Sequence, residues 1–166
     1  MSSEKRTAYE KIVYEYIDDL NRYALWLCKN PTLAKDLVQE TFLRAWKSFD
    51  KLREQKAAKS WLITILRREY ARTFERKVPD FANFDDLELE DQIEPDPDDR
   101  AEVRLMRKAM LNLDQKYREP IILQVIGGFS CDEIAEILGI TRSAVMTQLF
   151  RARQKIKDNL QVDEEP

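Results

Sequence analysis

Hydrophobic residues in the first 77 positions recur at spacings of three and four, which is the period of an α-helix. From Ala8 onward they would line one face of a long helix: Tyr9, Ile12, Val13, Tyr16, Ile17, Leu20, Tyr23, Ala24 and Leu27. Asn30-Pro31 then predicts a capped start for a second helix, since asparagine accepts bonds from free amides and proline suits the first helical position. The buried stripe of that second helix would be Ala34, Leu37, Val38, Thr41, Phe42, Ala45 and Trp46.

Two further helical stretches follow. A third helix is predicted from near Ser60 to about Arg76, and it should end before Val78-Pro79 because the residue preceding a proline disfavours the helical conformation. Residues 100–160 return to the helical pattern, with Val103, Met106, Met110 and Leu113 on one face and a further helix from Tyr117 to Ile126. No segment alternates as a strand does, so we expect an all-α protein.

The segment 80–99 separates these helical parts. It contains ten acidic residues, no basic residue and two prolines, Pro95 and Pro97. Such a composition is typical of a solvated linker, and about 20 residues could span roughly 65 Å when stretched. We therefore predict two small helical domains, at 1–78 and 101–166, joined by an extended acidic linker at 79–100.

The C-terminal part contains a helix-turn-helix pattern. Ser130 and Glu133 form a capping box, Gly139 suits the left-handed residue that ends a helix, and Thr141 is a natural N-cap for the next helix. The second helix would bury Val145, Leu149, Ala152 and Ile156 and expose Arg142, Ser143, Met146, Thr147, Phe150, Arg151 and Arg153. A polar and basic face of this kind fits the DNA major groove. A structural helix pair is the alternative, in which Met146 and Phe150 would fill the core.

The composition narrows the functional classes. Outside the acidic strip there are 28 basic and 21 acidic residues, a net charge of +7 that would attract phosphate groups. The absence of histidine excludes serine–histidine and cysteine–histidine catalysis and histidine metal ligation, and three glycines leave no phosphate-binding loop. We expect no enzymatic activity and no cofactor. Cys28 and Cys131 lie far apart and are interpreted as buried structural thiols rather than redox sensors. Without a long apolar run or a signal peptide, a cytoplasmic location is expected.

Three segments carry a family resemblance. GFSCDEIAEILGITRSAVMTQLFRARQKI (128–156) resembles the promoter −35 reading domain of bacterial RNA polymerase sigma factors. AKDLVQETFLRAW (34–46) and SWLITILRR (60–68) resemble their core-binding and −10 segments. The chain is thus similar, over nearly its whole length, to an extracytoplasmic-function (group IV) sigma factor of the sigma-70 family. That resemblance implies a region 2 bundle, a region 4 helix-turn-helix domain, and a non-enzymatic subunit that recognises −10 and −35 elements and melts the −10 region.

The resemblance also implies roles for particular residues. One helix face would bind core polymerase at its β′ clamp helices, through Asp36, Gln39, Glu40, Leu43 and Arg44, while region 4 would contact the β flap. The loop from about Phe49 to Lys59 would hold a flipped base, with Leu52 at its lip, whereas Trp46 and Trp61 are better explained as core. The residues expected at −10 DNA are Lys47, Lys51, Leu52, Arg53, Lys56, Lys59, Arg67, Arg68, Arg72 and Arg76. Those expected at −35 DNA are Arg142, Ser143, Met146, Thr147, Gln148, Phe150, Arg151 and Arg153.

The sequence departs from the family pattern at both DNA-reading helices. Many relatives have asparagine and aspartate where this chain has Arg68 and Arg72, so phosphate binding should outweigh base reading there. Basic residues are common in relatives where Met146 and Gln148 stand, which implies a different −35 sequence.

The implied partners are core polymerase, promoter DNA and an anti-sigma factor, which could hold the chain at the inner membrane without any insertion of the chain itself. The alternatives are a stand-alone helix-turn-helix repressor, a sigma-mimicking anti-sigma adaptor, and a metal-dependent nuclease that uses the acids of 80–99.

Overall fold

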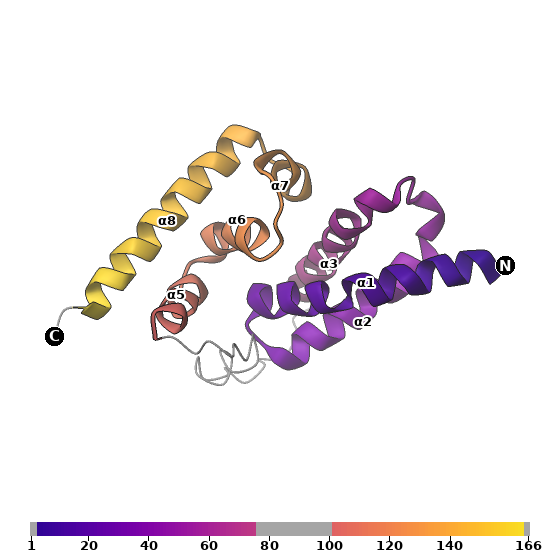
Figure 1. Cartoon of the computed structure of the whole chain (residues 1–166), viewed down its shortest axis with the longest axis horizontal. Helices are drawn as coiled ribbons and strands as arrows, with labels where there is room; N and C mark the ends of the chain where they lie inside the picture. The colour runs from indigo at the N-terminus through magenta and orange to yellow at the C-terminus, as the bar shows by residue number, and fades with distance from the viewer. Residues whose placement is uncertain (1–2, 76–100, 165–166) are drawn as a thin grey trace.

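The computed structural model describes residues 3–75 and 101–164, and within these ranges the chain forms helices and no strand. The all-α prediction is confirmed for them (Figure 1). The N-terminal half contains α1 (Ser3–Cys28), α2 (Pro31–Lys47), the 3-10 turns η1 (Phe49–Lys51) and η2 (Gln55–Ala57), and α3 (Ala58–Glu75). The C-terminal half contains α5 (Ala101–Leu111), α6 (Gln115–Val125), α7 (Cys131–Leu138) and α8 (Arg142–Glu164). The acidic linker predicted at 79–100 lies outside the described residues.

A tight turn between α1 and α2 folds the N-terminal half back on itself. Lys29 has a left-handed backbone with φ of 57°, which ends α1. Asn30 is the predicted N-cap of α2, and its side chain accepts hydrogen bonds of 3.1 Å from the amides of Thr32 and Leu33. Because the first amides of a helix have no partner within the helix, this cap stabilises the start of α2 where it packs against α1.

The helix-turn-helix is formed by α7 and α8. Ser130 and Glu133 make both hydrogen bonds of the predicted capping box, at 3.2 and 3.0 Å. Gly139 ends α7 with φ of 67°, a conformation that costs a residue with a side chain about 1–2 kcal/mol. The Thr141 hydroxyl accepts a 3.1 Å hydrogen bond from the amide of Ala144 and so caps α8. Local chemistry therefore sets the angle between the two helices.

Two residues that the periodicity assigns to buried faces are exposed instead. Ile17, at the edge of the buried face of α1, is 37% exposed, and Met106 on α5 is 43% exposed. The last turn of α5, with Ala109, Met110 and Leu111, makes the buried contacts of that helix. Periodicity indicates which residues share a face, but the width of the neighbouring helices decides how much of that face is covered.

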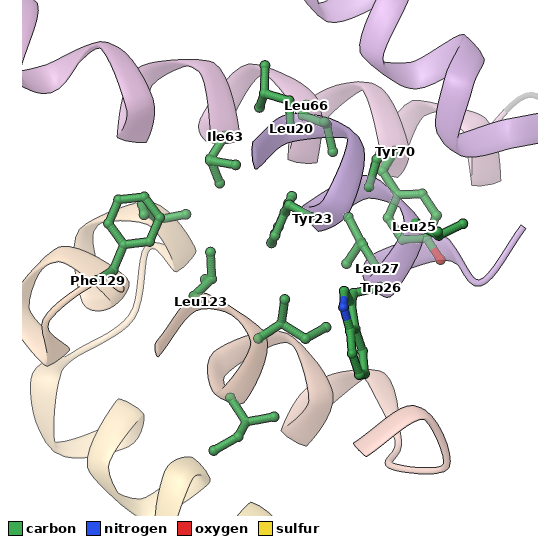
Figure 2. Packing of buried hydrophobic residues seen from close by; sticks show 14 of the residues in the cluster. Leu20, Tyr23, Leu25, Trp26, Leu27, Ile63, Leu66, Tyr70, Leu123 and Phe129 are labelled. Atoms are coloured by element: carbon green, nitrogen blue, oxygen red, sulfur yellow. The ribbon is translucent and has the colours of Figure 1, made fainter. Parts of the chain in front are cut away.

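The two halves pack against each other through one continuous hydrophobic core. In Figure 2, Ile63 and Leu66 of α3 and Tyr23 of α1 lie above Leu123 of α6, and Phe129, the residue that precedes the helix-turn-helix, lies to their left. A continuous buried cluster is the usual mark of a single folded unit. The sequence allows a connection long enough to separate the halves, but in this conformation they share a core.

Candidate nucleic-acid interface

The outer face of α8 presents the side chains that the sequence assigns to −35 DNA. Its inner face is buried as predicted, through Val145, Leu149, Ala152 and Ile156. Gln148 is half-buried, and the other predicted −35 residues are exposed. Phe150 is 69% exposed and Met146 is 54% exposed, so the alternative that they fill the core is wrong. A solvent-exposed apolar side chain on such a helix can contact the methyl group of thymine.

Neighbouring residues orient two arginines of α8. The guanidinium Nε of Arg142 lies 3.6 Å from a carboxylate oxygen of Asp132 on α7. Arg153 donates a hydrogen bond to the side-chain oxygen of Gln124 on α6. Arg151 is exposed between them along the helix. The helix-turn-helix thus holds its own basic side chains at the surface, where they could meet phosphate oxygens.

A cleft of about 640 Å³ lies beside the loop that the sequence assigns to the −10 element. Leu52 and Trp61 line it, together with four basic residues of the predicted set, Lys51, Arg53, Lys56 and Arg68. The apolar side chains suit a stacked base and the cations suit its phosphate, while Glu54, Glu133 and Glu136 also line the cleft. Trp61, interpreted from the sequence as a core residue, lines the cleft. Trp46 and Phe49 instead pack against Tyr9, with ring centroids 5.1 and 5.4 Å from that of Tyr9.

The other predicted −10 residues have different surroundings. Lys47 is exposed, and Arg72 lies 3.3 Å from the buried carboxylate of Glu69. Lys59 and Arg67 point across to the C-terminal half, where Lys59 donates a 2.7 Å hydrogen bond to the carbonyl oxygen of Gly127. Arg67 is bound by the carboxylate of Glu119. Arg76 lies outside the described residues.

The predicted polymerase-binding residues lie together on the outer side of α2. Asp36 and Gln39 are exposed, Leu43 is 60% exposed, and Glu40 is half-buried. Arg44 differs from them, because its guanidinium Nε lies 3.1 Å from Glu40 and 2.6 Å from Glu69 of α3. Arg44 therefore ties α2 to α3, and its anchoring role toward a partner stays a prediction.

The structure adds residues that the sequence pattern did not assign to a site. An apolar groove of about 700 Å³ runs between α1 and α2, and Tyr14 and Ile17 of α1 line it together with Gln39 and Leu43. Tyr14 is 88% exposed, which is unusual for a large aromatic side chain. In the sequence, the one indication of this exposure is that Tyr14 lies one residue away from the apolar stripe of the first helix. Glu119, by contrast, carries no local signal, because its ion-pair partner is 52 residues distant.

The Cys28 thiol does not have the environment of a reactive cysteine. Burial raises the pKa of Cys28 to about 11, and its Sγ lies 3.3 Å from the carbonyl oxygen of Asn30. Both cysteines are half-buried rather than fully buried, so the interpretation as buried thiols is correct only in part.

Within the part of the chain that the structure describes, neither a metal site nor a membrane-spanning helix is present. No group of three or more acidic or cysteine side chains there could hold a metal ion. The acids of 80–99 invoked for a nuclease lie outside it. None of the helices described has both the length and the apolar content required to cross a bilayer.

Comparison with known proteins gives matches in both halves. Residues 12–79 match the family model of sigma-70 region 2, and residues 104–156 match that of sigma-70 region 4. SigW of Bacillus subtilis (strain 168), an ECF RNA polymerase sigma factor, is 30% identical, over 92% of this chain and 89% of its own length.

Two solved structures superpose on nearly the whole chain. The sigma factor RpoE, in complex with the anti-sigma factor NepR from Bartonella quintana, is 27% identical with a TM-score of 0.77, over 95% of this chain and 99% of that one. CnrH in complex with the cytosolic domain of CnrY is 26% identical with a TM-score of 0.70, over 96% and 91% of the two chains. Such scores require both halves to superpose together, so the relative placement of the halves is similar as well.

Proposed function

Since the chain belongs to the extracytoplasmic-function sigma factors of the sigma-70 family, we propose that three of its surfaces divide the work of promoter recognition between polymerase and DNA. The protein is an RNA polymerase sigma factor that directs transcription initiation. The observation that carries the assignment is the presence of region 2 and region 4 in order on one chain, each with an exposed face of suitable chemistry. A stand-alone helix-turn-helix regulator would leave region 2 without a role.

The outer side of α2 binds core polymerase at the clamp helices of the β′ subunit. Asp36, Gln39 and Glu40 supply hydrogen-bonding groups around the exposed apolar side chain of Leu43. The apolar groove beside them adds Tyr14 and Ile17, which enlarges the contact beyond the residues expected from the sequence. An apolar centre with a polar rim is the usual composition of a binding hot spot. Region 4 contacts the β flap.

The two DNA elements are read from opposite ends of the chain. The cleft beside Leu52 and Trp61 receives an unstacked base of the −10 element, and the surrounding lysines and arginines hold its phosphates. The exposed face of α8 enters the major groove of the −35 element. Catalysis of RNA synthesis belongs to the polymerase, so the chain itself is a specificity subunit and not an enzyme.

An anti-sigma factor is the partner proposed for the resting state. RpoE and CnrH, the solved relatives, are each seen in complex with such a protein or its domain. The similar placement of the two halves in this chain supports a partner of the same class. The chain would act in the cytoplasm and could be held at the inner membrane by that partner.

Promoter-dependent transcription tests this function. Core polymerase lacking its own sigma subunit is combined with the purified chain, and promoters are selected from a random library by run-off transcription. We expect accurate starts that depend on the chain, and Gln39→Ala should reduce them by weakening capture of polymerase. Gln161→Ala, the same change at an exposed position of α8 outside the predicted contact residues, is the matched control. A chain that neither associates with core polymerase nor directs any specific start would refute the assignment.

A further inference from the structure

One ion pair joins the two halves of the chain at a buried position. The carboxylate of Glu119 on α6 accepts hydrogen bonds from the guanidinium of Arg67 on α3 and, at 3.1 Å, from the hydroxyl of Tyr23 on α1. Arg67 also donates a 3.2 Å hydrogen bond to the carbonyl oxygen of Ile137 at the end of α7. Glu119 is 7% exposed and Tyr23 is 3% exposed. Three helices of the two regions therefore meet at a single carboxylate.

The charges at this point depend on each other. Burial by itself would lower the pKa of Arg67, but the hydrogen bond and the negative charge of Glu119 raise it above its ordinary value. Burial raises the pKa of Tyr23 well above its ordinary value, and the charge of Glu119 acts in the same direction. A buried charge that loses its partner is strongly destabilising. The two halves can therefore separate only if Arg67 and Glu119 become exposed to water.

Two further contacts lie beside the ion pair. The guanidinium of Arg118 donates hydrogen bonds to the carbonyl oxygen of Leu27 at 3.0 Å and to that of Leu113 at 2.8 Å, which links α1 to the turn before α6. Lys59 lies 5.2 Å from the ring centroid of Phe129, in addition to its hydrogen bond to Gly127. Polar bonds and the shared hydrophobic core therefore hold the same interface.

The closed arrangement covers one DNA-reading surface and leaves the other open. Glu133, Glu136 and Ile137 of α7 form one wall of the cleft that the proposed function assigns to the −10 element. The two carboxylates thus face the lysines and arginines of that cleft, where DNA phosphates would have to lie. Arg67 and Lys59, both predicted to bind −10 DNA, are occupied by contacts to the C-terminal half. The reading face of α8 stays exposed.

We propose that Glu119 is an intramolecular latch, which closes the free chain over its own −10 cleft by binding Arg67 and Tyr23. The −10 assignment of the cleft rests on the proposed function, whereas the closure itself concerns only this chain. When the chain opens, Arg67 loses the carboxylate of Glu119 and can bind DNA phosphates instead. The connection between the halves is long enough to permit this separation. The latch is selective, since a closed chain can still present α8 to −35 DNA.

Small-angle X-ray scattering of the full chain tests the closure. The wild-type profile should fit the closed arrangement, and Glu119→Gln should increase the radius of gyration. Glu102→Gln, an exposed acid on α5, removes the same charge and should leave the profile unchanged. Glu119→Arg should open the chain, and the double variant Glu119→Arg with Arg67→Glu should close it again. Recovery of the closed profile in the swap would attribute the opening to the pairing of these two side chains rather than to the loss of Glu119 alone, and a circular dichroism spectrum of each variant shows whether its helices are still folded.

Binding of a short fluorescent single-stranded DNA of random sequence tests what the closure covers. If the closed form is nine-tenths populated and Glu119→Gln opens the chain completely, the variant should bind about tenfold more tightly than the wild type. Tyr23→Phe should give a smaller increase, since it removes one hydrogen bond and no charge. An extended wild-type profile, or a Glu119→Gln profile equal to that of the wild type, would overturn the latch. An opened chain whose DNA affinity is unchanged would overturn the covering of the cleft. Neither readout involves polymerase, so failure of the proposed function would appear separately in run-off transcription.

Discussion

Two leucines on α2 allow the polymerase-binding surface to be tested separately from stability. Leu37 is 3% exposed and belongs to the core, whereas Leu43, less than two turns further along, is 60% exposed. Truncation of each to alanine removes the same atoms from the same helix. The two variants therefore differ mainly in what the side chain contacts, which makes Leu37→Ala the matched control for Leu43→Ala.

The burial of each side chain gives the expected magnitude. Removal of a buried leucine side chain costs about 2–5 kcal/mol, so Leu37→Ala should lower the free energy of unfolding by that amount. Full burial of a leucine side chain contributes about 1.5–3 kcal/mol, and Leu43 keeps less than half of that burial, so Leu43→Ala should cost about 1 kcal/mol or less. At the centre of an interface the same truncation costs about 2 kcal/mol, which is roughly a thirtyfold rise in Kd for core polymerase.

Chemical denaturation followed by tryptophan fluorescence measures the first quantity, and fluorescence anisotropy with labelled chain and core polymerase measures the second. Leu43→Ala should weaken binding with nearly unchanged stability, while Leu37→Ala should do the reverse wherever it remains folded. If Leu43→Ala binds polymerase as the wild type does, the outer side of α2 is not the docking surface. If it unfolds as readily as Leu37→Ala, the exposure of Leu43 in this structure is wrong.

Three further predictions concern other parts of the structure. Gly139→Ala should cost about 1–2 kcal/mol in thermal unfolding because φ is 67° there, and Gly139→Asn should cost less; equal losses would count against conformational strain. Glu69→Gln should cost about 1–2 kcal/mol, discounted for the partial exposure of Arg44 and Arg72, and a stability equal to the wild type would show that this carboxylate does not tie α2 to α3. At pH 8 the Cys28 thiol, with a pKa raised to about 11, should react with a disulfide reagent about a hundredfold more slowly than in unfolded chain, as measured in Cys131→Ser; equal rates would contradict its burial.

Local signals in the sequence were sufficient to locate the helices and their ends. The cap at Asn30, the capping box at Ser130 and the left-handed Gly139 were all expected and are all present. Each depends on hydrogen bonds or backbone angles within four residues, so neighbours along the chain contain the whole interaction. The buried stripe of α8 was predictable for the same reason, because a regular helix converts spacing into a face.

Tertiary structure alone decided which of these faces meet. Periodicity placed Ile17 and Met106 inside, yet both are exposed because the packing leaves that part of each helix face uncovered. The sequence assigned both Arg67 and Arg68 to −10 DNA, but one binds Glu119 in the other half and the other lines the −10 cleft. Such pairings join residues far apart in the chain, and they form only when the whole hydrophobic core fixes the positions of the helices. The sequence therefore determined the helices and their chemistry, while packing of the two halves decided which charges are engaged and which surfaces stay open.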